Sequence, residues 1–108
     1  MSTRANIFIR NNYDDYDKEI LYHHCDGYPE GVGRDLRIIL QKFAEEYPDV
    51  TLTKRLIADY ICKSDEQFEI TTPNRAADAE YNYEINLEKR RVDYEHVYTS
   101  HVEWLCDF

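Results

Sequence analysis

The chain has 108 residues, which is enough for one domain with a single core and too few for two. An aromatic content of 14% argues against disorder, and only 3 glycines and 3 prolines exclude collagen-like and low-complexity classes. With 22 acidic and 13 basic residues, the net charge of -9 repels phosphate backbones, so we expect no direct binding to nucleic acid. Such acidity either keeps a small protein soluble or attracts a basic partner, including the groove of a nucleic-acid enzyme.

The cysteines and the apolar runs narrow the setting. Cys25, Cys62 and Cys106 are an odd number and form no CxxC pair, so neither a disulfide framework nor a cysteine-rich zinc site is expected. No apolar signal-peptide core follows Met1, and no apolar run approaches the roughly 20 residues that span a membrane. We therefore expect a cytoplasmic protein that has no cofactor and no membrane partner.

The chain begins with two predicted strands. Residues 4–10 and 18–24 are rich in strand formers, and the Asn/Asp-rich segment 11–17 between them is typical of a turn. Together they predict a hairpin. Because successive strand residues face opposite sides, His23 and His24 should point to opposite faces of it.

Two helices are predicted next. Apolar residues recur at helical spacing over residues 33–47, and Pro48 ends this helix. A second one-sided helix runs to about Lys63, with either Thr51 or Thr53 as its N-cap.

The second half of the chain predicts more strands. Residues 64–80 are ambiguous, although Phe68 and Ile70 favour a short strand. Apolar or aromatic residues alternate with polar ones over residues 81–87 with a strict period of two. Residues 92–98 alternate in the same way and are expected to form the strand that pairs with them. Apolar residues in the tail indicate one last short element: Val102, Trp104, Leu105 and Phe108.

The element order predicts an α+β protein with a single domain over residues 1–108. Short hairpins favour an antiparallel sheet, so we expect about four strands in the order ββααββ. Both helices are one-sided and should cover one face of this two-layer sandwich. The other face should be polar and rich in tyrosine.

All three glycines fall in the loop 26–33, between a predicted strand and a predicted helix. Such a loop can cradle phosphate, but the spacing matches no phosphate-binding motif and its acidic residues oppose an anion. The alternative is a structural turn whose glycines take positive φ and whose amides near Tyr28 donate to the Asp26 carboxylate. On that interpretation, Asp26→Ala should destabilise the protein more than Asp14→Ala or Asp15→Ala.

The run His-His-x-Asp-Gly-Tyr-Pro-Glu-Gly-Val-Gly at 23–33 is the most specific motif in the chain. With Ser-Thr-Arg-x-Asn-Ile at 2–7 and Tyr-x-Tyr-x-Ile-x-Leu at 81–87, it resembles a family of small proteins from phages and prophage-bearing bacteria. The resemblance implies a mobile-element protein acting in a bacterial cytoplasm, and it implies no activity. Cys25 stands where an aromatic residue is expected. The motif residues in this chain are His24, Asp26, Gly27, Tyr28, Pro29, Gly31 and Gly33.

A small set of polar side chains could carry chemistry. His24 and Asp26 could share a face, and His96 could reach them if the hairpins pair suitably. Such a set could hold a metal or transfer protons, but Asp26 could equally bind the loop and His24 could be half-buried. Cys25 has histidine neighbours but no third group that would orient it as a nucleophile.

The tyrosines also allow two interpretations, as core residues with wet hydroxyls or as anchors for a partner protein. The main hypothesis is a non-enzymatic phage-type interaction module, monomer or homodimer, that inhibits a host defence or nucleic-acid enzyme. The alternative is a small-ligand or nucleotide-binding domain that uses the loop 26–33. No catalytic or metal-binding residue is assigned. The candidate partner- or ligand-binding residues are His24, Asp26, Gly27, Tyr28, Pro29, Gly31, Gly33, Tyr83 and His96.

Overall fold

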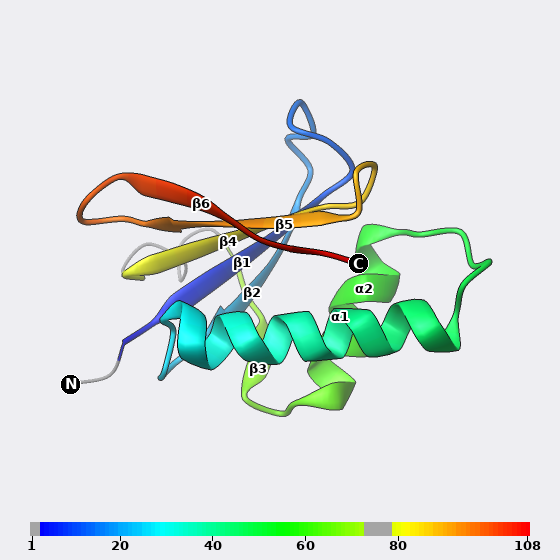
Figure 1. Ribbon diagram of the computed structural model, residues 1–108, viewed down its shortest axis with the longest axis horizontal. Helices are drawn as coiled ribbons and strands as arrows, with labels where there is room; N and C mark the ends of the chain where they lie inside the picture. Colours follow the sequence, from blue (N-terminus) through cyan, green and yellow to red (C-terminus); the bar gives the residue numbers. More distant parts are fainter. Residues whose placement is uncertain (1–2, 73–78) are drawn as a thin grey trace.

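A computed structural model describes residues 3–72 and 79–108 of the chain (Figure 1). One π-helical turn (Pro29–Gly33) runs directly into the first helix. Of residues 64–80, whose secondary structure the sequence leaves ambiguous, residues 73–78 lie outside the described part. The elements follow in the order β1 (Ala5–Arg10), β2 (Glu19–His23), α1 (Arg34–Glu46), α2 (Lys54–Ser64), β3 (Phe68–Ile70), β4 (Tyr81–Asn86), β5 (Arg91–His96) and β6 (His101–Asp107).

The strands form one six-stranded sheet in the order β3-β2-β1-β4-β5-β6. Neighbouring strands are antiparallel except β1 and β4, which are parallel with Ala5 opposite Tyr81. The predicted α+β class is therefore confirmed, whereas the four-stranded antiparallel sheet in the order ββααββ is wrong. The sheet has two more strands than expected, because β3 and β6 extend its two edges. After β3 the next strand, β4, pairs with β1 on the side away from β2, and local periodicity cannot show such a long-range pairing.

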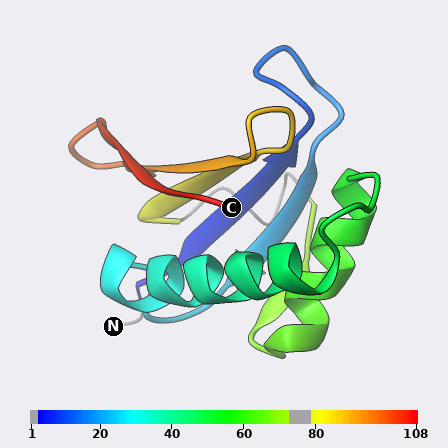
Figure 2. The ribbon, with the colours of Figure 1, turned by 45° about the vertical axis from the view of Figure 1, so that its right-hand side comes forward.

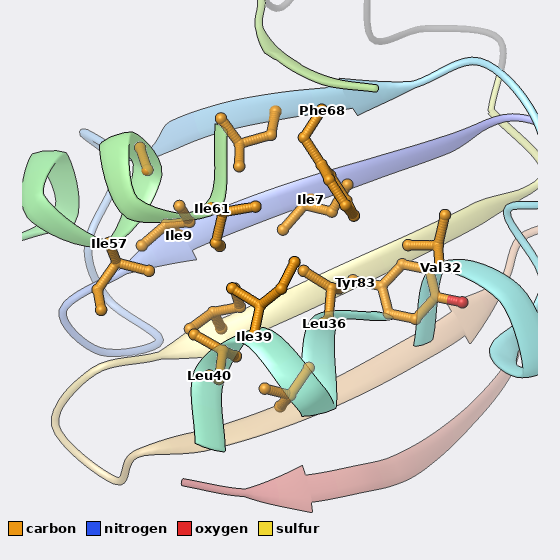
Figure 3. Close-up of a cluster of buried hydrophobic side chains, with 14 of the residues drawn as sticks. Ile7, Ile9, Val32, Leu36, Ile39, Leu40, Ile57, Ile61, Phe68 and Tyr83 are labelled. Atoms are coloured by element: carbon orange, nitrogen blue, oxygen red, sulfur yellow. The ribbon is translucent and has the colours of Figure 1, made fainter. Parts of the chain in front are cut away.

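Both helices lie on one side of the sheet (Figures 1 and 2). Figure 3 shows their apolar side chains meeting those of the central strands, where Ile7, Leu36, Ile57 and Tyr83 have no exposed surface. Burying such side chains is the main favourable contribution to folding. This core fixes which face of each strand is left for function.

The helix boundaries agree with the sequence signals. Helix α1 ends at Glu46, and Tyr47 follows as its C-cap directly before Pro48. Helix α2 begins after Thr53, whose Oγ1 accepts a hydrogen bond from the Leu56 amide at 3.1 Å. The structure thus identifies Thr53, and not Thr51, as the cap.

The face of the sheet away from the helices is mixed, and the prediction that it is polar and rich in tyrosine is only partly right: Phe8 and Ile20 lie opposite each other among its polar residues. Tyr83 lies opposite Ile7 on β1 and Tyr94 on β5, so these side chains share the helix-covered face. The intervening residues of β4, Asn82 and Glu84, occupy the open face. The predicted alternation is confirmed, and of the two interpretations of the tyrosines the core interpretation holds for Tyr83 and for Tyr81 and Tyr94, which pack against the core.

Candidate functional site

The glycine loop is packed against the backbone of the segment that leads into β1. The Gly27 amide donates to the Thr3 carbonyl at 2.8 Å, and the buried Tyr83 hydroxyl donates to the Gly27 carbonyl at 2.7 Å. A Cβ at Gly27 would lie 2.8 Å from the Arg4 carbonyl carbon, closer than van der Waals contact allows. Glycine is required here because two backbone segments nearly touch.

Gly31 is required for the same reason within the loop itself. A Cβ there would lie 2.2 Å from the Asp26 carbonyl oxygen, which also accepts the Val32 amide at 2.8 Å. The prediction of positive φ at the glycines is wrong, because the only left-handed residue of the loop is Asp26, with φ 54°. Asp and Asn tolerate that conformation better than most residues.

Tyr83 connects this loop to the core. Its side chain has no exposed surface, so it offers nothing to a partner in this conformation. A Cβ at the buried Gly33 would lie 3.4 Å from the Tyr83 hydroxyl. Burial raises the pKa of Tyr83 strongly, which keeps the hydroxyl protonated as a donor to the loop.

The exposed residues of the motif bind one another. The Tyr28 hydroxyl donates to Asp26 Oδ1 at 3.0 Å, and this bond raises the pKa of Tyr28. The hydrogen bond found at the Asp26 carboxylate therefore comes from the Tyr28 side chain and not from a backbone amide. His24 Nδ1 lies 3.0 Å from the Tyr22 hydroxyl, and half-buried Pro29 begins the π-helical turn.

His96 lies far from this loop. It sits on β5 opposite Tyr81, with the two rings stacked at 4.7 Å, and its Nε2 lies 3.1 Å from Glu80 Oε2. Strands β1 and β4 separate it from the β2 end that carries His24 and Asp26. Within residues 3–72 and 79–108, no group of three or more His, Cys, Asp and Glu side chains could hold a metal ion.

The packing of the loop disfavours nucleotide binding there, since Gly27 and Gly31 face other backbone atoms and Gly33 faces the side chains of Leu105 and Tyr83. A groove of about 620 Å³ opens elsewhere, between α1 and α2, where Phe43, Tyr47 and Tyr60 line it together with residues of both charge signs. Their rings pack on one another with centroids 5.1 to 6.2 Å apart.

No helix in the described part of the chain has the length and apolar character needed to cross a bilayer.

A different surface emerges at the edge of the sheet, on the β5–β6 hairpin (Figure 1). Four large apolar side chains of this hairpin are exposed: Val97 at 36%, Tyr98 at 74%, Val102 at 61% and Trp104 at 56%. Trp104 is the only tryptophan of the chain. We call these four residues the hairpin strip.

The open face beside the hairpin strip is acidic. Glu84 lies opposite Asp93, Asp93 opposite Trp104, and Glu95 opposite Val102, so carboxylates of β4 and β5 border the apolar residues of β6. Arg10 pairs with Glu84 at 2.9 Å. Burial nevertheless raises the pKa of Glu84.

A shallow hollow of about 230 Å³ lies on this open face. Asn82, Glu95 and Val102 line it, together with Glu84 and Asp93. Among the described residues, the half-buried Glu95 carboxylate has neither a hydrogen bond nor an ion pair. We call this feature the acidic hollow.

The helix-side face of the same hairpin carries a hydrogen-bonded trio. The Tyr94 hydroxyl donates to Glu103 at 2.6 Å, and His101 Nε2 lies 3.0 Å from the same carboxylate. These bonds lower the pKa of Glu103, and the bond to Glu103 contributes most to raising that of Tyr94 to about 12. The bond between Tyr94 and Glu103 adds a side-chain link across the two strands of the hairpin.

Sequence reasoning missed the hairpin strip and the acidic hollow. The signal was present, since Val102 and Trp104 alternate with polar residues in the manner of a strand. The sequence alone groups Val102 and Trp104 with Leu105 and Phe108 in one last short element. Alternation places Leu105 on the face opposite Val102 and Trp104, toward Gly33, and a β-bulge between β5 and β6 puts Cys106 on that covered face as well.

The chain matches no protein-family model, no curated protein and no solved structure.

Proposed function

We propose that the chain is a non-enzymatic protein-interaction module that binds its partner through the hairpin strip and the acidic open face beside it. The observation that carries the proposal is the half-exposed Trp104 on an edge strand, next to an exposed Val102 and a row of carboxylates. Tryptophan and tyrosine are the residues that most often dominate binding energy at protein interfaces.

The position of β6 supports the proposal. Among the strands of residues 3–72 and 79–108, none pairs with the outer side of β6, so this edge can also accept a strand from another chain. Folded monomers seldom leave large apolar residues clustered on such an edge unless something binds there. The hydrogen bond between Tyr94 and Glu103 links the two strands of the hairpin, and such links favour a preorganised binding surface.

The charge of the molecule indicates the kind of partner. A net charge of -9 and the carboxylates of the open face favour a basic protein surface. Together with the resemblance to small phage proteins, this leads us to propose an inhibitor of a host defence or nucleic-acid enzyme, acting in the bacterial cytoplasm. The exposed loop residues His24, Asp26 and Tyr28 would form a second, separate contact.

The test is co-precipitation from bacterial lysate at about 0.15 M salt, the physiological ionic strength, with three forms of the protein. The wild type should retain a stoichiometric partner that Val102→Ser/Trp104→Ser fails to retain. The control is Ile38→Ser, which removes a similarly exposed apolar residue from α1, where Ile38 is 55% exposed. Equal recovery by all three forms, or no stoichiometric partner even at low salt, would contradict the proposal.

A further inference from the structure

We infer that the acidic hollow is a socket for one arginine side chain of the partner protein, with the guanidinium on Glu95 and the aliphatic stem on Val102. The inference rests on the proposed function, because it names the chemistry that the partner must bring to this surface. It draws on the size of the hollow, the free carboxylate, and the apolar residues that border it.

The size of the hollow selects a side chain over a free ligand. Pockets for small molecules usually enclose roughly 300–1,000 Å³, whereas this hollow measures about 230 Å³ and is open to solvent. It would bury too little of an independent ligand to hold it tightly. One long side chain, delivered by a partner that is also held elsewhere, needs no more room than this.

The charges of the hollow select a cation. Arg10 partly neutralises Glu84 and Arg91 pairs with Asp93 at 3.0 Å, but Glu95 has no such partner among the described residues. Glu95 is half-buried, and the like charges of Glu84 and Asp93 line the same hollow. A cation placed there gains a hydrogen-bonded ion pair and reduces this repulsion.

The apolar border favours arginine over lysine. Val102 lines the hollow, and Trp104 lies next along the same face of β6. A guanidinium is planar, weakly hydrated and able to stack on an aromatic ring, and its forked donors can bind both oxygens of the Glu95 carboxylate. An ammonium group matches this mixture of apolar and carboxylate surface less well.

The probe is a blocked Gly-Arg-Gly tripeptide, titrated into isotopically labelled protein at constant ionic strength. Amide shifts should concentrate at Asn82, Glu95, Val102 and Trp104, and the indole N–H of Trp104 gives a unique signal because the chain has no other tryptophan. The same peptide with citrulline, which keeps the shape and lacks the charge, should produce no saturable shift. The lysine peptide should bind more weakly than the arginine peptide.

Two variants with the same change in net charge complete the test. Glu95→Gln should weaken binding by roughly tenfold, as expected for the loss of a charge-assisted hydrogen bond. Glu45→Gln removes an exposed carboxylate on α1. It should change the affinity by less than about twofold when the titration is run at about 0.15 M salt, because salt then screens the general attraction of the peptide to an acidic protein. Equal effects of the two variants, or shifts spread over the whole surface, would overturn the inference.

The outcomes separate this inference from the proposed function. If Val102→Ser/Trp104→Ser loses its partner while the arginine peptide ignores Glu95, the module stands and the arginine socket is wrong. If the peptide binds at Glu95 but the variant retains its partner, the hollow binds cations and the hairpin strip is not the interface.

Discussion

At Gly27 and Gly31, the neighbouring backbone leaves no space for a side chain. We predict that Gly27→Ala and Gly31→Ala each lower the free energy of unfolding by more than about 2 kcal/mol, since backbone atoms must move to admit a methyl group. Gly33→Ala should change it by less than about 1 kcal/mol, because Gly33 is helical and a Cβ there would meet the end of the Leu105 side chain at 3.2 Å. Urea unfolding of the three variants measures the difference.

Equal losses for all three glycines would show that the loop does not pack as described. A neutral Gly31→Ala would be the clearest contradiction, because its Cβ would lie closest to other backbone atoms.

Asp15 is a residue whose structural role the sequence concealed. It was expected to be one of several solvated charges, but its carboxylate pairs with Lys54 at 2.9 Å and accepts the amides of Asn11 and Asp17. These hydrogen bonds lower the Asp15 pKa. The expectation that Asp15 is as unconstrained as Asp14 is therefore wrong.

This pairing makes the effect of Asp15 depend on pH. Because the pKa is lower in the folded state, the stabilisation is present above the pKa of the unfolded chain, about 3.9, and is lost as the pH falls through the folded value. Asp15→Asn should lower the urea midpoint at pH 7, and its deficit should shrink steadily below about pH 4. Asp14→Asn is the control, and a deficit that stays constant down to the acid limit would rule out this account.

At the scale of elements, the first turn of α2 depends on one hydroxyl. Thr53→Ala should lower the free energy of unfolding by about 1 kcal/mol, since the Leu56 amide loses its acceptor. Thr51→Ala, at an exposed position outside the helix, should change it by less than about 0.5 kcal/mol. Thermal or urea unfolding distinguishes the two residues, and equal effects would mean that the helix does not begin after Thr53.

Removing a negative charge from the open face of β4 and β5 should stabilise the folded protein. Glu95→Gln should raise the free energy of unfolding by up to about 0.5 kcal/mol, because it removes a half-buried carboxylate that lies near Glu84 and Asp93. If the variant unfolds at lower urea than the wild type, Glu95 has a stabilising partner and its proposed role is wrong.

Sequence patterns predicted most of the elements but not how they are arranged. Helical periodicity and Pro48 placed α1 within one residue at each end, and the hairpin of β1 and β2 follows from the strand formers on either side of its turn. The parallel pairing of β1 with β4 was missed because it joins residues far apart in the chain. The hairpin strip was not predicted because both faces of β6 carry apolar residues, so the sequence does not separate the exposed Val102 and Trp104 from Leu105, which packs against the core.

For the whole molecule, net charge opposes compactness. With 22 acidic and 13 basic residues, mutual repulsion should weaken the folded state at low ionic strength. The melting temperature should therefore rise from about 20 mM to about 500 mM sodium chloride, where the screening length falls from about 20 Å to about 4 Å. A fall in melting temperature over this range would mean that the surface ion pairs outweigh the excess charge.

The parallel pairing of β1 with β4 also bears on how the chain folds during its own synthesis. Strand β1 ends at Arg10, yet the neighbour of Ala5 on its inner side is Tyr81, which is synthesised much later than β1. Until the ribosome has released β4, the N-terminal hairpin keeps one strand edge open and the core lacks Tyr83 and Ile85. Any product truncated before Tyr81 therefore leaves an unpaired apolar strand, which is a target for aggregation or for chaperones, and completion of the sheet is a late step that depends on the whole chain.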